Sequence, residues 1–335
     1  MAELVAAEPL LLRADQAEPR YLEALQTAVA ACAADTAGQT CYICLGSDDE
    51  EEGLVRGCSC RGTAGFAHVS CLARQAEVAV ERGSGPCWER WHTCGLCEQE
   101  YHGVVKCALG WACWKTYLGR PETDKIRELA MMQLGNGLHD AGHHEDARSV
   151  REAELSMIRR LGASENRMLE VQTNLAIAYG PLGRLEEALQ LERDVYSGRL
   201  RLNGEEHEKT LRAANNYASS LKNLSHFGEA KTLLRKMMPV ARRVLRDSSD
   251  LTLLMRWNYA EALYEDPAAA LDDLREAVTT LEETKRTARR LLGGAHPLTV
   301  EIEVALQDAR AVLSAREGDV EPLRAAVEAM APGDA

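Results

Sequence analysis

Eight cysteine and histidine residues near the start of this chain constrain its fold more than any other feature. They stand in four close pairs, in the order Cys41 and Cys44, Cys58 and Cys60, His68 and Cys71, and Cys94 and Cys97. Thiolate and imidazole ligands suit tetrahedral zinc, and a C-x2-C turn brings two thiolates to one ion. Four pairs fill two closed sites, so the sequence predicts two structural zinc ions that supply much of the local folding free energy. A disulfide framework is the alternative, but these spacings favour metal.

The cysteine distribution and the net charge limit the class of protein. All eleven cysteines lie between Cys32 and Cys113 of a 335-residue chain with a net charge of -13. The metal-type spacing favours a reducing compartment, and the negative charge argues against nucleic acid or an anionic membrane surface as a partner. No apolar run is long enough to span a membrane, and the segment Leu4–Leu12 makes a poor signal peptide. We therefore expect a soluble protein in the cytoplasm, with the nucleus as the alternative.

The order of the ligands resembles the RING-variant finger, or RING-CH, of MARCH-type ubiquitin ligases over about residues 40–102. The matching stretches are Cys41-Tyr-Ile-Cys44, Cys58-Ser-Cys60-Arg-Gly-Thr, His68-Val-Ser-Cys71-Leu and Cys94-Gly-Leu-Cys97. The resemblance implies a cross-brace, in which the first and third pairs bind one ion and the second and fourth pairs bind the other. A PHD finger shares the ligand order, but it usually spaces its second pair more widely and leaves fewer residues before the histidine.

The resemblance also implies a function. Fingers of this type dock a ubiquitin-charged conjugating enzyme and contribute no nucleophile, so the thioester stays on that enzyme. The docking patch is apolar and shallow, and the matching positions here are Ile43 and Leu96, with Trp91 as a third candidate. The alternative interpretation is that Ile43 and Leu96 only pack the two zinc knuckles.

Two positions depart from the family pattern. Gln75 stands where many MARCH-type fingers have a tryptophan, and Glu98 stands where a basic residue often helps to hold ubiquitin. Trp88 or Trp91 is a candidate replacement for the missing tryptophan. These departures keep open the alternative of a non-catalytic zinc-finger scaffold or adaptor, including a PHD-like reader.

The second half of the chain repeats itself. Asn174-Leu-Ala, Asn216-Tyr-Ala and Asn258-Tyr-Ala recur at intervals of 42 residues. A fixed period of this length with two helices per unit predicts a stacked solenoid, because a single helix pair cannot bury its own apolar face. Over about residues 125–318 the pattern resembles tetratricopeptide repeats (TPRs) of the kinesin-light-chain type. This resemblance implies an array that binds a protein or peptide substrate and does no chemistry.

The repeated residues also predict where the helices begin and end. We expect each repeated asparagine to open the first helix of its unit. Glycines follow the predicted second helices at Gly162, Gly204 and Gly293, where a left-handed residue would cap the helix.

The whole chain is therefore predicted to be mostly α, with a zinc-stapled finger followed by an α-solenoid. The expected boundaries are an N-terminal helical lead-in at 1–38, the finger at 39–103, a connecting segment at 104–124, the repeats at 125–318 and a C-terminal helix and tail at 319–335. The connecting segment carries Trp111, Trp114 and Tyr117, which we interpret as a hydrophobic seam rather than as a binding surface.

Arginines recur near the ends of the predicted second helices, at Arg160, Arg201, Arg243 and Arg290. One interpretation is a basic row for an acidic or phosphorylated partner. The other, which we favour, is the favourable placement of cations at helix C-termini.

Four cysteines fall outside the ligand pattern: Cys32, Cys87, Cys107 and Cys113. No general base is paired with any of them, so we predict spare or buried thiols rather than a catalytic nucleophile.

Overall fold

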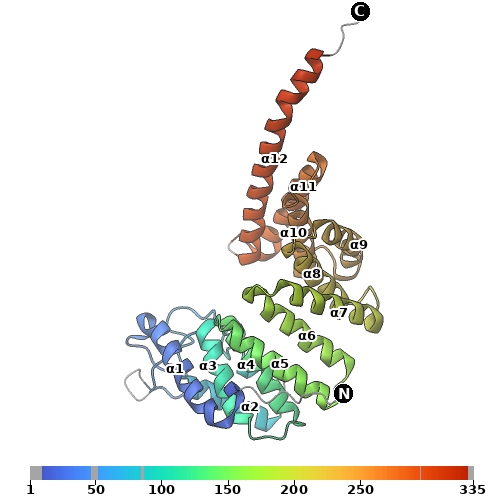
Figure 1. The fold of residues 1–335 in the computed structure, drawn as a ribbon. Coiled ribbons are helices and arrows are strands. Elements are labelled where there is room, and N and C mark those ends of the chain that lie inside the picture. The colour runs from blue at the N-terminus through green and yellow to red at the C-terminus, as the bar shows by residue number, and fades with distance from the viewer. Residues whose placement is uncertain (1–9, 47–51, 84–86, 295, 331–335) are drawn as a thin grey trace, which may run out of the picture. The chain divides into compact units, whose positions relative to one another are not determined.

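The computed structural model describes residues 10–46, 52–83, 87–294 and 296–330, with side chains described as far as Gly318 except that of Cys87. The chain forms two compact units, unit 1 at Met1–Gly183 and unit 2 at Arg184–Ala335. Helices dominate both units in Figure 1, and the described residues contain two isolated β-bridges but no strand. The predicted fold class is confirmed. None of the described helices is both long and apolar enough to cross a membrane.

Unit 1 contains a long N-terminal helix, the finger and the first repeat helices. Its α-helices are α1 (Ala14–Thr36), α2 (Val69–Arg82), α3 (Gly103–Tyr117), α4 (Lys125–Asp140), α5 (His144–Arg160) and α6 (Glu165–Tyr179). Three short 3-10 helices accompany them, η1 (Leu10–Leu12), η2 (Cys87–Trp91) and η3 (Gly180–Leu182). Helix α3 lies against α1, α2 and α4 and so forms the centre of the unit.

Helix α3 is buried on nearly all sides, which explains its unusual composition. Trp111, Trp114 and Tyr117 are each at most 4% exposed, and small residues fill the turns between them. Because α3 contacts the finger helix α2 as well as the repeat helix α4, these aromatic rings form the predicted hydrophobic seam.

Glycines allow α3 and α4 to approach closely. A Cβ atom on Gly137 of α4 would lie 2.6 Å from the carbonyl oxygen of Lys106, and one on Gly110 of α3 would lie 3.2 Å from that of Gln133. The finger is therefore continuous with the first repeat helices through a tightly packed helix pair.

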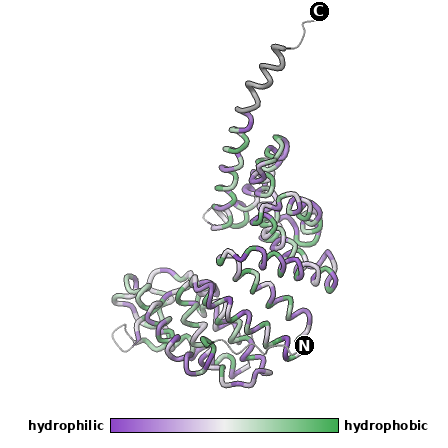
Figure 2. The backbone as a smooth tube through the Cα atoms, in the orientation of Figure 1, coloured by the Kyte–Doolittle hydropathy of each residue, from purple (hydrophilic) through white to green (hydrophobic). Residues whose placement is uncertain are grey.

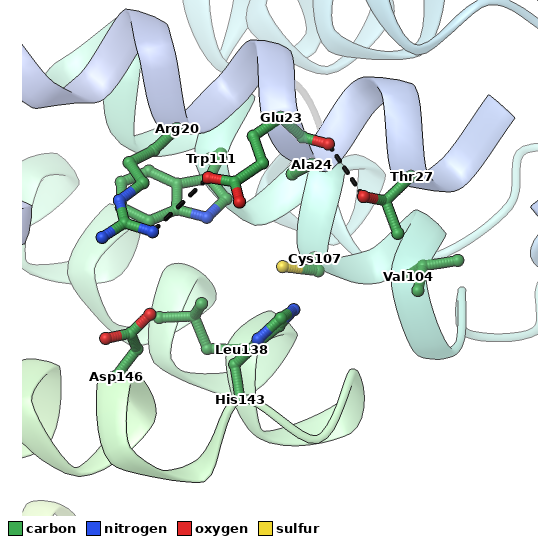
Figure 3. Close-up of a pocket in the computed structure, with 10 residues that line it drawn as sticks. All are labelled: Arg20, Glu23, Ala24, Thr27, Val104, Cys107, Trp111, Leu138, His143 and Asp146. Carbon is green, nitrogen blue, oxygen red and sulfur yellow. Dashed lines mark hydrogen bonds and ion pairs between the residues drawn. The ribbon is translucent and has the colours of Figure 1, made fainter. Parts of the chain in front are cut away.

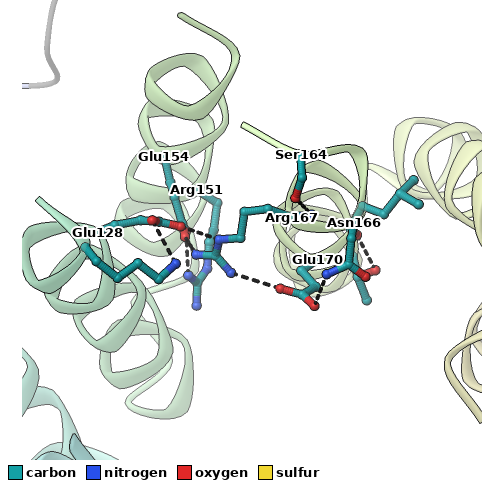
Figure 4. A network of polar contacts seen from close by, with 10 residues as sticks. Glu128, Arg151, Glu154, Ser164, Asn166, Arg167 and Glu170 are labelled. Carbon is teal, nitrogen blue, oxygen red and sulfur yellow. Dashed lines mark hydrogen bonds and ion pairs between the residues drawn. The ribbon is translucent and has the colours of Figure 1, made fainter. Parts of the chain in front are cut away.

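A buried polar network ties α4, α5 and α6 together, as Figure 4 shows. Glu154 is fully buried and accepts hydrogen bonds from Arg151 at 2.8 Å and from Arg167 at 2.7 Å. Arg167 also pairs with Glu128 of α4. Buried charges need such multiple partners to offset the loss of hydration, so the network fixes how these three helices pack. Gly135 leaves room for the Arg151 guanidinium, which would lie 2.7 Å from an added Cβ atom.

Unit 2 continues the helix pairs. Its helices are α7 (Leu185–Asn203), α8 (Glu208–Asn223), α9 (Phe227–Leu245), α10 (Asp250–Tyr264), α11 (Leu271–Leu292) and α12 (Pro297–Met330). Hydrophobic and hydrophilic residues alternate along α9 and α11 in Figure 2, as expected of amphipathic helices. Their apolar sides join a core that includes Leu234, Met237, Leu253, Tyr259 and Leu281.

The predicted helix starts need correction, whereas the predicted helix ends hold. Asn174, Asn216 and Asn258 lie well inside α6, α8 and α10 instead of opening them. The amide of Asn258 donates a 3.0 Å hydrogen bond to Asn215, so this asparagine joins neighbouring helices rather than capping its own. Helix α6 begins instead after Ser164, whose hydroxyl accepts from the backbone of Arg167.

All three predicted cap glycines adopt positive φ angles, of 66° at Gly162, 80° at Gly204 and 87° at Gly293. Arg246 takes the corresponding place after α9 with a φ of 69°, a conformation that glycine would adopt with less strain.

Two of the recurring arginines, Arg160 and Arg243, pair with acidic residues of the same unit. Arg160 binds both carboxylate oxygens of Glu122 in unit 1, and Arg243 binds Glu206 in unit 2. Neither guanidinium is therefore reserved for a partner, in keeping with the structural interpretation of these positions.

Candidate metal centre

The first ligand group consists of Cys41, Cys44, His68 and Cys71. All four ligand atoms lie within 4.8 Å of one another. The Nδ1 atom of His68 lies 3.4 Å from the sulfur of Cys44 and 3.7 Å from that of Cys71, which identifies Nδ1 as the ligand nitrogen. Cys71 and His68 stand at the N-terminal end of α2, so this helix carries half of the group.

The second ligand group consists of Cys58, Cys60, Cys94 and Cys97, again with all ligand atoms within 4.8 Å. The sulfurs of Cys60 and Cys94 are 3.9 Å apart. Gly65 is required beside this group, because its φ is +85° and a Cβ atom there would lie 2.5 Å from the Cβ atom of Cys60. The structure thus brings the eight residues together in the two sets that the cross-brace resemblance implied.

The two C-x2-C knuckles have the same backbone conformation. The backbone N–H of Ile43 donates to the sulfur of Cys41, and that of Leu96 donates to the sulfur of Cys94, both at 3.4 Å. Each knuckle ends on a left-handed residue that is not glycine, Leu45 with a φ of 64° and Glu98 with a φ of 57°. N–H donors aimed at sulfur stabilise thiolates, the form that binds metal.

The ligand spacing fits zinc. Four sulfur ligands at 2.3 Å from a tetrahedral ion are about 3.8 Å apart, and a sulfur and a nitrogen ligand are slightly closer. The 3.9 Å separation of Cys60 from Cys94 and the 3.4 and 3.7 Å separations around His68 Nδ1 match this geometry. Both groups are closed four-ligand sets, as in structural zinc sites rather than catalytic ones.

The protonation of the thiols reflects their crowding. Burial, together with neighbouring thiols, raises the pKa of Cys58 above its usual range and that of Cys60 to about 11. Burial opposes the ionisation of Cys41 and Cys97 as well, but hydrogen bonds outweigh it and lower the pKa of each to about 7. For Cys41 these come mainly from backbone N–H groups, and for Cys97 from the backbone of Gln99 and from neighbouring thiols. Thiolates gathered this closely repel one another, and a divalent cation removes that repulsion.

The surface beside the two groups is apolar. Leu96 is 51% exposed, Ile43 is half-buried, and Leu45, which sequence reasoning did not single out, is 78% exposed. Because Leu45 is exposed and has a left-handed backbone, it does not pack in a core. Its position directly after the ligand Cys44 is the sequence signal that could have identified it as part of this surface. The two knuckles thus present apolar side chains to solvent.

Trp91 does not belong to this surface. Its side chain is 0% exposed, and its ring packs edge-on against Tyr117 of α3 at a centroid distance of 5.7 Å. A fully buried ring cannot contact a partner, so the inclusion of Trp91 in the docking patch is corrected. It joins η2 to the aromatic seam instead.

The two departures from the family pattern lie near the knuckles. Gln75 is half-buried on α2, and its side-chain oxygen lies 3.5 Å from the Tyr42 hydroxyl. Glu98 is exposed. The ring centroids of Trp88 and Tyr117 are 6.0 Å apart, so Trp88 packs with the same seam as Trp91. The short helix η2, which carries both tryptophans, lies against α2, the helix of Gln75.

The cysteines outside the ligand pattern differ in their surroundings. Cys107 and Cys113 are buried in α3, and burial raises the pKa of both thiols, that of Cys107 to about 12. Cys32 exchanges weak contacts with the backbone of Arg56. The side chain of Cys87 lies outside the described part of the chain. None of the three described thiols has the environment of a nucleophile.

A small cavity of about 60 Å³ lies between α1, α3 and the α4–α5 turn (Figure 3). Cys107, Trp111 and Leu138 line its apolar side, and Glu23 and Asp146 stand at its rim. Its volume corresponds to about two water molecules, which is too small for a substrate.

Comparison with known protein families agrees with this geometry. The model of the RING-variant domain matches residues 41–97, which span all eight ligands, and a tetratricopeptide repeat model matches residues 168–208. No protein with a curated description matches the chain.

Solved structures of helical repeats are similar to much of the chain. Nearly identical TPR-like repeats of a Podosopora anserina chain described as a kinesin light chain are 21% identical, with a TM-score of 0.46 over 67% of this chain and 97% of that one. BtubC (BKLC) from P. vanneervenii is 15% identical, with a TM-score of 0.45 over 80% of this chain and 93% of that one. Taken with the helix pairs and the ligand groups described above, the family matches show that this chain carries a RING-variant domain at residues 41–97 followed by tetratricopeptide-type helical repeats.

Proposed function

We propose that this protein is a RING-type ubiquitin ligase that holds two structural zinc ions. The finger recruits a ubiquitin-charged conjugating enzyme through Ile43 and Leu96, and the repeats hold the protein substrate. The observation that carries this proposal is the apolar surface of the two knuckles, where Leu96 is 51% exposed beside a closed metal site. Exposed apolar groups on a rigid, metal-stapled loop are well suited to docking a partner.

The chemistry assigned to the finger needs no nucleophile of its own. Cys107 and Cys113 are buried and have raised pKa values, so their thiols are poor acceptors for ubiquitin. In this proposal the thioester stays on the conjugating enzyme. The ligase acts by holding that enzyme near the substrate in a reactive orientation, which is catalysis by proximity.

The repeats supply the other half of the proposal. Stacked helix pairs expose long surfaces on which extended segments of other proteins can lie. The repeats follow the finger in the same chain, so one molecule can hold both the substrate and the charged enzyme.

The test is a ubiquitin-transfer assay with activating enzyme, a panel of conjugating enzymes and the purified full chain. We expect ubiquitin chains with the parent protein and a loss of roughly tenfold or more in rate with Ile43→Ala. Leu22→Ala is the matched control, since Leu22 is an exposed leucine on α1 and belongs to neither knuckle.

If protein that holds about two zinc ions transfers no ubiquitin with any conjugating enzyme of the panel, the result would favour the non-catalytic scaffold instead. Gln75 and Glu98 are the observations that favour this second function. Gln75 replaces a tryptophan that many fingers of this family carry, and Glu98 replaces a basic residue that often helps to hold ubiquitin. Equal activity of the parent and Ile43→Ala would leave ligase activity standing but would remove Ile43 from its docking surface.

A further inference from the structure

Lysine is scarce in this sequence and absent from the finger. Lysine and arginine together number 39, but only eight of them are lysines and none precedes Lys106. The eight are Lys106, Lys115, Lys125, Lys209, Lys222, Lys231, Lys236 and Lys285. Both residue types carry a positive charge, but arginine stays protonated in proteins, whereas the lysine amine can lose a proton and act as a nucleophile. The chain therefore offers few amines to a ubiquitin thioester held at the finger.

Three lysines belong to the compact unit that contains the finger, and two of these are held in place. The side chain of Lys106 is 12% exposed, and its ammonium lies 2.9 Å from a carboxylate oxygen of Glu100. The ammonium of Lys115 lies 2.8 Å from Glu18 of α1 and 4.3 Å from the centroid of the Tyr21 ring. An amine that is largely buried, or is held by both a carboxylate and a ring, is poorly placed to approach a thioester on another protein.

Lys125 is the exposed lysine of this unit. Its side chain is 61% exposed at the first turn of α4, and its ammonium lies 2.8 Å from Glu128. Glu128 also pairs with Arg167 in the network of Figure 4. The pair between Lys125 and Glu128 joins neighbouring turns of one helix and is open to solvent on the lysine side, so it is weak and readily broken. When the Lys125 amine leaves, Glu128 keeps Arg167 as its partner.

The start of α4 lies beside the end of α3 that supports the fourth ligand pair. The side chain of Arg127 donates a 2.9 Å hydrogen bond to the backbone carbonyl oxygen of Arg120, and the Arg120 guanidinium lies 5.5 Å from the centroid of the Tyr117 ring. That ring packs in turn against Trp91, just before the fourth ligand pair. The position of Lys125 relative to the finger is therefore set by packed side chains within one unit.

We infer that Lys125 is the residue of this protein on which its own finger places ubiquitin. The inference rests on the proposed ligase function and names an acceptor for it. The unprotonated Lys125 amine attacks the carbonyl carbon of the ubiquitin thioester on the docked conjugating enzyme. A C–N isopeptide bond forms, the C–S bond breaks, the cysteine of that enzyme leaves as a thiolate, and the proton lost by the nitrogen passes to water. The reaction takes place within one molecule, because unit 1 contains both Lys125 and the finger and so gives the amine a high effective concentration.

The experiment is a self-ubiquitination assay of the zinc-loaded full chain with activating enzyme, ubiquitin and the panel of conjugating enzymes. Trypsin leaves a Gly-Gly remnant on each modified lysine, and mass spectrometry measures the fraction modified at every lysine in the initial phase. Lys125→Arg keeps the charge that pairs with Glu128 but removes the amine, and Lys115→Arg is the matched control in the same unit. Discharge of the charged conjugating enzyme to free lysine is measured in parallel, because it reports ligase activity without any acceptor on this chain.

We expect most of the Gly-Gly remnant at Lys125, and a fall of roughly fivefold in the initial rate of self-modification with Lys125→Arg. Lys115→Arg should keep that rate within about twofold of the parent value. Both variants should discharge the enzyme to free lysine at the parent rate, since neither substitution changes the finger. The rate of self-modification per molecule should stay constant when the protein is diluted about tenfold, as expected of a reaction within one molecule.

Three results would overturn the inference and leave ligase activity standing. They are a remnant concentrated on any other lysine, an unchanged rate of self-modification in Lys125→Arg, and a rate per molecule that falls in proportion to dilution. If the parent protein accelerates discharge to free lysine with no enzyme of the panel, the ligase proposal itself fails, and the assignment of Lys125 falls with it. The reaction with free lysine therefore distinguishes the two failures.

Discussion

The side-chain amide of Gln133 donates a 3.2 Å hydrogen bond to the backbone carbonyl oxygen of Trp91. The bond is buried and joins the repeat helix α4 to the last turn before the fourth ligand pair of the finger. Gln133 is 1% exposed and Trp91 is fully buried, so water cannot replace either partner. The finger and the first repeat helices are therefore held as one folding unit.

Replacing Gln133 by leucine should lower the free energy of unfolding by about 1–3 kcal/mol, because the Trp91 carbonyl would be buried without a donor. Urea unfolding followed by circular dichroism measures the change. Gln26→Leu on the exposed side of α1 is the control and should change stability by less than about 0.5 kcal/mol. Equal stability of the two variants would show that the bond does not couple the finger to α4.

Cys60→Ser should reduce the zinc content from about two ions per chain to about one, because its hydroxyl is a poor substitute for a thiolate ligand. Metal analysis of the purified protein by mass spectrometry measures the ratio. Cys32→Ser, which alters a cysteine outside both ligand groups, should keep both ions. A full zinc complement in Cys60→Ser would remove Cys60 from the ligand set.

Gly65→Ala and Gly62→Ala separate steric fit from backbone strain. Both glycines have positive φ angles, of 85° and 61°, but a Cβ atom on Gly62 would have no neighbour within 4 Å. We expect Gly62→Ala to cost about 1 kcal/mol of stability and to keep its zinc. Gly65→Ala should in addition lose the ion of the second group, because the new methyl displaces Cys60. Similar zinc affinities in the two variants, measured with a competing chelator, would contradict this.

Glu192 makes unit 2 sensitive to pH. It is 3% exposed on α7, its Oε2 atom has no hydrogen-bond partner in the described structure, and burial raises its pKa to about 8. The folded state thus keeps a proton that the unfolded state releases near its ordinary value of 4.5. Protonated Glu192 therefore contributes fully to the free energy of unfolding below about pH 4.5. That contribution is lost as the pH rises towards 8.

Glu192→Gln should therefore raise the free energy of unfolding at pH 8 by roughly 1–3 kcal/mol and should change it little at pH 5. Denaturant titrations at the two pH values measure the difference. Glu186→Gln, at an exposed position six residues earlier on α7, supplies the control. A variant that is no more stable than the parent at pH 8 would show that Glu192 is already ionised without penalty.

The ligand groups could be predicted from the sequence because the two ligands of each pair lie close together along the chain, at spacings typical of zinc sites. A C-x2-C turn determines its own conformation, and left-handed residues at Leu45 and Glu98 follow from the same turn. The repeat period was equally readable, because each helix pair must bury an equivalent face. The cap glycines were predictable for the same local reason.

The errors arose where distant contacts decide the structure. A tryptophan between ligand pairs is equally compatible with a surface and with a core. Trp91 is buried through contacts with residues distant in sequence, among them Tyr117 of α3. The repeated asparagines resembled helix caps, but their role depends on a neighbouring helix, as the bond from Asn258 to Asn215 shows. The domain boundaries expected from composition remain predictions. The compact unit 1 runs from Met1 to Gly183 and so includes the finger together with the first repeat helices.

Because helix α3 packs against both the finger and α4, the finger cannot be separated from α3 without exposing buried side chains. A fragment that ended at Tyr101 would leave Trp91 without the aromatic ring that covers it, and a fragment that began at Lys125 would deprive α4 of its closest neighbour. Transplanting the eight ligands alone would therefore yield a metal-binding peptide with an uncovered face. The smallest portable piece is the stretch from α1 through the first repeat pair, which makes recombination between families at the edge of the finger costly.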